Sequence, residues 1–126
     1  MTNSYTLSVD SHFVAAMALP SVSGPCSQLH GHTYLVKVTI SGDRLDAHGM
    51  LIDHTVIRDM LDTILQPLDH QYLNELPLFS KTPPTAEHIA RHIFQAMEEA
   101  TCDHPITIQA VHIAENPHVN ITYRRT

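Results

Sequence analysis

An alternating pattern between residues 30 and 41 restricts the fold more than any other feature of the sequence. Side chains of even number, from His30 and His32 through Tyr34 to Ile40, share one face of an extended chain. This set is largely apolar beyond the histidines, whereas the odd-numbered set, which includes Lys37, is largely polar. The pattern is typical of an antiparallel strand with one buried face, so we expect a half-buried strand that ends at Gly42.

Further elements follow from the same kind of pattern. A period of two predicts strands at residues 4–17, 106–115 and 119–125. Apolar residues at helical spacing follow Asp53 as far as Pro67, and a second such set follows Thr85. Asp53 and Thr85 are therefore candidate helix N-caps. The order is ββααββ, and the simplest α+β arrangement for it is an antiparallel sheet with the two helices on one face.

Size and charge limit the classes of protein that this chain can belong to. With 126 residues and 43% hydrophobic content, it is expected to form a single domain over residues 1–126. Its formal charge is −6, and the only basic cluster is Arg124–Arg125. Duplex nucleic acid is bound by neutralising phosphates with lysine and arginine, so we expect no nucleic-acid partner.

The sequence also predicts where the protein is found. It has no long apolar run, and its first residues lack the charged and apolar regions of a secretory leader. We therefore expect a cytoplasmic protein with no membrane partner. The two cysteines, Cys26 and Cys102, are a poor disulfide framework and should both remain thiols there.

The 11 histidines are unusually many for this length, and two of them are close in sequence. His30 and His32 are two residues apart in a predicted strand, so both imidazoles can reach one metal ion. A zinc site needs three or four ligands, and partly buried histidines that hydrogen bond to neighbours are the alternative. Cys26 precedes them in a Ser/Pro/Gly loop. It can be a reactive thiol, or a small buried apolar residue as free cysteines often are.

Two acidic residues are further candidates. Asp69 and His70 follow the first predicted helix, either as a solvated helix end or as a pair that transfers a proton to a third group. We do not expect these adjacent side chains to bond each other. Glu115 ends an apolar strand, where a carboxylate needs a positive partner. That partner is either a cationic or amidine-like ligand or an arginine of the last strand, Arg124 or Arg125.

Six short motifs in the chain match one known family in the same order. They are FVAAMALP, CSQLHGH, GMLID, LDHQYLNELP, PPTAEHIA and AENP. Between about Tyr5 and Tyr123 the sequence resembles the 6-pyruvoyltetrahydropterin synthase and 6-carboxytetrahydropterin synthase family. The resemblance implies the tunnelling fold, or T-fold, in which ββααββ subunits assemble around a barrel as a trimer or a hexamer.

The resemblance also implies an activity and roles for individual residues. The activity is that of a lyase acting on 7,8-dihydroneopterin triphosphate, with zinc as its metal. The spacing of Cys26 and the two histidines resembles the bacterial 6-carboxytetrahydropterin synthase, on the route to queuosine and other deazapurines. The implied roles are zinc ligation by His30 and His32, general base catalysis by Cys26, proton relay by Asp69 and His70, and pterin binding by Glu115 with Thr85 and Glu87.

One position departs from the family pattern. Where the family has its first zinc ligand, the histidine of F-x-A-A-H, this sequence has Met17, a soft and weak ligand for zinc. Met17 should lie on the same strand face as Phe13 and Ala15. His12 has the opposite parity and could replace it only if the strand contained a bulge. Two alternatives to the carboxy-type lyase therefore stay open: 6-pyruvoyltetrahydropterin synthase activity, or a non-catalytic pterin-binding paralogue with an impaired metal site.

Overall fold

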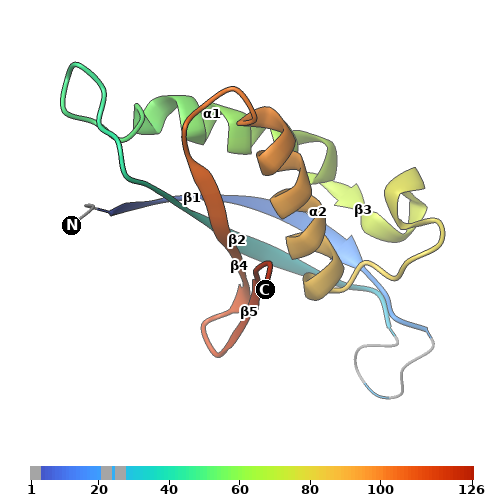
Figure 1. Ribbon diagram of the computed structural model, residues 1–126. Coiled ribbons are helices and arrows are strands. Elements are labelled where there is room, and N and C mark those ends of the chain that lie inside the picture. The colour runs from blue at the N-terminus through green and yellow to red at the C-terminus, as the bar shows by residue number, and fades with distance from the viewer. Residues whose placement is uncertain (1–3, 21–23, 25–27) are drawn as a thin grey trace.

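The computed structural model of the protein describes residues 4–20, 24 and 28–126. One sheet, antiparallel except for its short edge strand, carries two helices, which lie together on one of its faces (Figure 1). The elements in chain order are β1 Tyr5–Met17, β2 His30–Gly42, α1 His54–Leu65, β3 Gln71–Tyr72, α2 Ala86–Ala100, β4 Thr107–Asn116 and β5 Val119–Tyr123.

The five strands are arranged in the order β3-β1-β2-β4-β5. β1 and β2 pair without interruption from Tyr5 opposite Gly42 to Met17 opposite His30. β4 pairs with β2 and β5 pairs with β4, both antiparallel. The predicted α+β class, the strand order along the chain and the placement of both helices on one face are confirmed.

Both helices begin at the predicted capping residues. The side chain of Asp53 accepts a hydrogen bond from the Thr55 amide at 2.9 Å at the start of α1. Thr85 Oγ1 accepts one from the His88 amide at 3.2 Å at the start of α2. Such caps satisfy amide groups that have no partner inside the helix.

The core lies between the helices and the face of the sheet that they cover. Its largest side chains are fully buried and come from both layers, among them Tyr34, Phe13, Phe94, Ile57, Leu61, Ile89 and Ile93. The opposite face of the sheet, called the open face below, is covered by no described helix. No helix within the described residues is long and apolar enough to cross a membrane.

The segment between the helices, for which the sequence pattern predicts neither helix nor strand, is ordered. Its residues form three short 3-10 turns and the two-residue strand β3, which pairs in parallel with Ala15 and Ala16 of β1. Leu68, Leu73 and Phe79 from this segment are buried. The missed order has a physical cause, because so short a strand has too few residues to show a periodic pattern.

Candidate functional site

His30 and His32 lie at the start of β2, on the same face as buried Tyr34. Their ring centroids are 4.8 Å apart and the rings meet edge to face. Nδ1 of His30 lies 2.8 Å from the carbonyl oxygen of Gln28, so this nitrogen carries the proton and donates it. Nε2 of His30 then holds the free lone pair. A carbonyl that fixes the tautomer in this way is the usual companion of a metal-binding histidine.

Met17 lies directly opposite His30 in the β1–β2 ladder. It is 2% exposed, on the same face as buried Phe13 and Ala15, as the sequence predicts. Its Sδ accepts a hydrogen bond from the hydroxyl of Tyr34 at 3.0 Å. Tyr34 is itself fully buried and stacks on Phe13 with ring centroids 4.7 Å apart. The thioether is therefore a packed core group that already has a polar partner.

His12 lies on the open face and is exposed. The pairing of β1 with β2 continues without a register shift from Tyr5 to Met17, so β1 contains no bulge against β2. A bulge was the condition under which His12 could replace Met17 beside the two histidines. That alternative is wrong, because period-two alternation holds along the whole strand and turns the His12 ring to the other face.

The donor set fits a metal ion only in part. The two imidazoles are close together, and the backbone bond of His30 prepares one of them to bind. Met17 does not complete a zinc site, because a thioether is a weak ligand for zinc and this one accepts a bond from Tyr34. Within the part of the chain that the structure describes, no three His, Cys, Asp or Glu side chains are placed to hold one ion.

Cys26, the predicted general base, lies outside the described residues. Cys102, the other cysteine, is exposed after the end of α2 and is a free thiol.

Asp69 and His70 bond each other, which corrects the expectation that adjacent side chains would not. His70 Nδ1 lies 3.0 Å from Asp69 Oδ2. His70 has a φ of 59°, in the left-handed region that few residues other than glycine adopt, and this turn of the backbone brings the two side chains together. Backbone conformations of this kind are found preferentially at functional sites.

Asp69 is also fixed to the edge of β1. Its Oδ1 accepts a hydrogen bond from the amide of Val14 at 2.9 Å. The amide of His70 donates a hydrogen bond to the carbonyl oxygen of Val14 at 2.5 Å. The Val14 amide is the main cause that holds the pKa of Asp69 below its usual value, and bonding to His70 adds to it. Asp69 is thus a carboxylate near neutral pH, with His70 as its partner.

Asn74 makes a second attachment to β1. Its side-chain oxygen accepts the amide of Ala18 at 2.9 Å, and its side-chain nitrogen donates to the carbonyl oxygen of Ala18 at 2.8 Å. The motif LDHQYLNELP therefore holds the segment after α1 against the edge of β1. Sequence reasoning missed this role of Asn74, since an asparagine that pairs with a backbone distant in sequence leaves no local signal.

Glu115 is the extra residue of a β-bulge. β4 and β5 pair at Ala114–Asn120 and again at Asn116–Val119, so Glu115 has no partner on β5. A bulge of this kind redirects a side chain. Glu115 and His32 both line a hollow of about 650 Å³ at this end of the sheet. Burial raises the pKa of Tyr34, and the nearby charge of Glu115 raises it further.

The structural alternative for Glu115 was an ion pair with an arginine near the C-terminus. Arg125 instead contacts Glu98 of α2, with Nη2 2.5 Å from Oε1. Glu115 forms no ion pair with either arginine within the described residues.

Thr85 and Glu87 lie at the start of α2. The hydroxyl oxygen of Thr85 is used by the helix cap, and Glu87 is exposed in the first turn. Neither residue lines the hollow that His32 and Glu115 share.

The predicted residues thus form two groups within one chain. Glu115 shares a hollow with His32, next to His30. Asp69 lines a different hollow of about 440 Å³, together with His12 and with residues of α1. The single chain does not bring the carboxylate of Asp69 into the hollow that contains Glu115.

Comparison with known proteins shows the family of the chain. The profile described as 6-pyruvoyl tetrahydropterin synthase matches residues 6–126. The chain belongs to this family. A solved structure of the 6-pyruvoyl tetrahydropterin synthase from Caenorhabditis elegans has the same fold, with a TM-score of 0.86 and 25% identity over 99% of this chain and 98% of that one.

Curated relatives narrow the comparison within the 6-pyruvoyl tetrahydropterin synthase family. The protein is similar to the 6-carboxy-5,6,7,8-tetrahydropterin synthase of Bacillus subtilis, with 35% identity over 96% of this chain and 86% of that protein. It is also similar to the protein of the same name from Synechocystis, with 43% identity over 70% of each chain. Both relatives carry the name of the carboxy-type enzyme that the spacing of Cys26, His30 and His32 resembles.

Proposed function

We propose that the protein is a lyase of the 6-carboxytetrahydropterin synthase type that acts on 7,8-dihydroneopterin triphosphate, on the route to queuosine and other deazapurines. The observation that carries the proposal is the common hollow of His32 and Glu115, beside the tautomer-fixed imidazole of His30. A carboxylate without an ion pair would suit the guanidine-like edge of a pterin, and the two histidines would supply metal-binding nitrogens close to it. The names of the curated relatives support the same reaction.

His30 and His32 would supply two ligands to zinc, with the third position left to water or to oxygen atoms of the substrate. Zinc bound there would polarise the side-chain oxygens of the substrate and acidify the adjoining C–H bond. Glu115 holds the pterin ring and so orients its side chain toward the histidines. Met17 supports this arrangement by packing and contributes at most a weak ligand.

Proton transfer would be divided between Cys26 and His70. Asp69 holds the Nδ1 proton of His70, which leaves Nε2 as the nitrogen that gives or takes a proton. The His70 side chain is 78% exposed and so accessible to a substrate. Cys26 would act as the general base on the other side of the reacting carbon.

The two groups would meet through assembly of the protein. Since Asp69 and Glu115 line different hollows, we propose that a second copy of the chain brings its Asp69 and His70 to the hollow of the first, in a trimer or a hexamer. We propose a cytoplasmic location, where both thiols stay reduced. Sedimentation of the purified protein tests the assembly, and a fully active monomer would contradict it.

Identification of the product tests the activity. Protein purified without chelator is incubated with 7,8-dihydroneopterin triphosphate, and mass spectrometry is expected to detect 6-carboxytetrahydropterin. Cys26→Ala should abolish turnover and keep the fold, whereas the matched variant Cys102→Ala should keep both. A 6-pyruvoyl product would instead support the pyruvoyl-type alternative.

One observation favours a second candidate, a non-catalytic pterin-binding paralogue. Met17 stands where the family has its first zinc ligand and accepts a hydrogen bond from Tyr34, so metal retention is expected to be weak. Saturable pterin binding without any turnover, in protein loaded with zinc, would support this alternative and overturn the lyase.

A further inference from the structure

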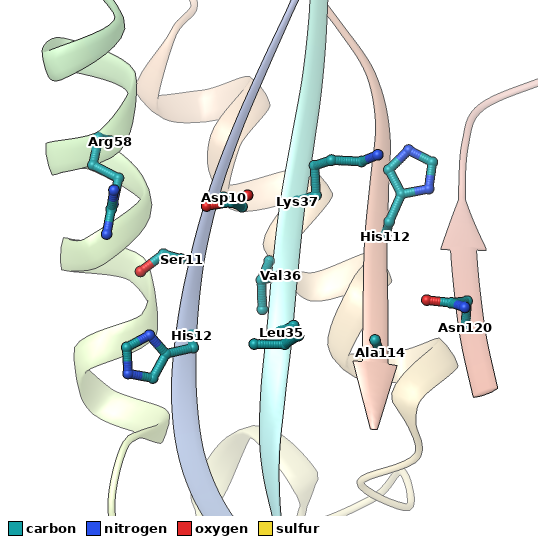
Figure 2. Close-up of a pocket in the computed structure, with 10 residues that line it drawn as sticks. All are labelled: Asp10, Ser11, His12, Leu35, Val36, Lys37, Arg58, His112, Ala114 and Asn120. Carbon is teal, nitrogen blue, oxygen red and sulfur yellow. The ribbon is translucent and has the colours of Figure 1, made fainter. Parts of the chain in front are cut away.

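The open face of the sheet carries a hollow of about 510 Å³ that the proposed reaction does not use. Figure 2 shows that its lining crosses β1, β2, β4 and β5, with Arg58 on α1 beside β1. The polar residues that line it are Asp10, Ser11, His12, Lys37, Arg58, His112 and Asn120, although the hydroxyl of Ser11 points to Asp62 of α1. Asn120 also lines the hollow of His32 and Glu115, and His12 and Arg58 also line the hollow of Asp69. None of the polar residues is assigned above to zinc, pterin or proton transfer.

Strand pairing aligns the central residues of this hollow. Lys37 lies opposite Asp10 on one side and opposite His112 on the other. The Lys37 side chain extends toward His112 and away from Asp10 (Figure 2). The ammonium group of Lys37 therefore lies beside His112 and β4, and not beside the carboxylate of Asp10.

Arg58 pairs with Asp62 at 3.7 Å, but two other cations near this hollow have no such partner in the part of the chain that the structure describes. Within the described residues, neither Lys37 nor Arg124 forms an ion pair, although the protein has 13 acidic side chains against 7 basic ones. Both charges act on His112, whose pKa is lowered by burial first, then by Lys37 and by Arg124. Two unpaired cations that lie close to one histidine in an acidic protein make a local positive potential.

Hydroxyl groups hold the histidine in place. His112 Nδ1 lies 2.8 Å from Thr122 Oγ1, and its Nε2 lies 3.5 Å from Thr39 Oγ1. Ser8 continues this row at 3.1 Å from Thr39. Hydroxyls can donate or accept, so the row accommodates both a neutral and a protonated ring. No hydrogen bond within the described residues uses the Lys37 ammonium or the Asn120 side-chain amide, and both line the hollow.

We propose that this hollow is a binding site for an oxyanion of the phosphate type, held by Lys37 and Asn120, with His112 and Arg124 supplying further positive charge. Unpaired ammonium and amide donors suit phosphate oxygens, which accept several charge-assisted hydrogen bonds at once. Asp10 is the one carboxylate in the lining. It lies on the far side of Lys37 from His112, so the anion is placed on the β4 side of the lysine.

The test measures binding of two probes, inorganic phosphate and tripolyphosphate, to the full-length protein by titration calorimetry. Metal is first removed and His30→Ala/His32→Ala protein is measured in parallel, so that phosphate oxygens cannot bind through a metal ion. Saturable binding in both proteins is expected. A tighter complex with tripolyphosphate would identify a polyphosphate chain as the ligand, and equal affinity would identify a single phosphate group.

A matched pair of variants locates the site. Lys37→Met is expected to weaken binding by about tenfold or more, the usual effect of losing one charge-assisted contact, and Lys81→Met should change it by less than about twofold. His112→Asn tests the supporting charge and should weaken binding less than Lys37→Met. The proposal is overturned if neither probe binds saturably, or if the two lysine variants weaken binding equally. The pterin reaction does not enter this measurement, so its failure and failure of the proposed lyase are separate results.

Discussion

The histidine pair and the Asp69–Asn74 segment are held in place by different means. His30 and His32 belong to β2, whose ladder with β1 extends over 13 residues of each strand. The Asp69–Asn74 segment is attached to β1 by a two-residue strand and by the side chains of Asp69 and Asn74. An alanine at either histidine should therefore alter chemistry without altering the fold. In the segment, one substitution should release the backbone that positions the others.

The largest expected effect is loss of metal from the histidine pair. His30→Ala and His32→Ala should each abolish stoichiometric metal, because each removes one of two close nitrogen ligands. The midpoint of thermal unfolding should change little, since both rings lie at the end of the ladder. Metal content is measured by mass spectrometry after purification without chelator, with His48→Ala and His12→Ala as controls. Full occupancy in the double variant would refute ligation by this pair.

Met17→His should increase the zinc affinity of the same site. A third imidazole opposite His30 should tighten zinc binding by about tenfold or more, and each tenfold gain corresponds to about 1.4 kcal/mol. Competition with a chromophoric chelator measures the affinity, and Met50→His adds a histidine in an exposed loop as the control. Unchanged affinity for Met17→His would show that the position opposite His30 is not part of a metal site.

Asn74→Ala should break the attachment of the segment. It removes both bonds to Ala18 and leaves a partly buried amide and carbonyl without partners, which costs about 1–3 kcal/mol. Denaturant unfolding measures the loss, with Gln95→Ala on an exposed face of α2 as the control. Equal stability of the two variants would contradict a structural role for Asn74.

Asp69→Asn should have the smallest effect, confined to the acid side. The pKa of Asp69 is lower in the folded protein than the ordinary value of an aspartate, so its ionised form stabilises the fold above that ordinary pKa. This contribution is lost as pH falls through the lowered folded pKa. Thermal midpoints recorded from pH 7 downward should therefore converge for the native protein and Asp69→Asn at the acid end. Asp103→Asn is the control, and parallel curves would argue against the bond to Val14.

The sequence predicted geometry wherever the backbone is regular. Period-two alternation correctly placed Met17 on the face of Phe13 and Ala15, because nothing interrupts β1. It failed at His70, where a single left-handed φ joins two side chains that a regular backbone would separate. It could not pair Lys37 with His112, which are neighbours only through the register of β2 and β4. Such pairing depends on packing across the whole sheet, and no local pattern specifies it.

The attachment at Val14 and Ala18 has a consequence for hydrogen exchange. Both amides belong to the first strand or its end, but their acceptors are side chains of Asp69 and Asn74, not carbonyls of a neighbouring strand. Their protons can exchange whenever the Asp69–Asn74 segment detaches from β1, whereas the central amides of β2 exchange only when the sheet itself opens. Exchange at these two positions therefore reports the free energy of local detachment, separately from that of global unfolding. The segment that carries the proposed proton relay thus has its own stability, which two amide resonances can measure.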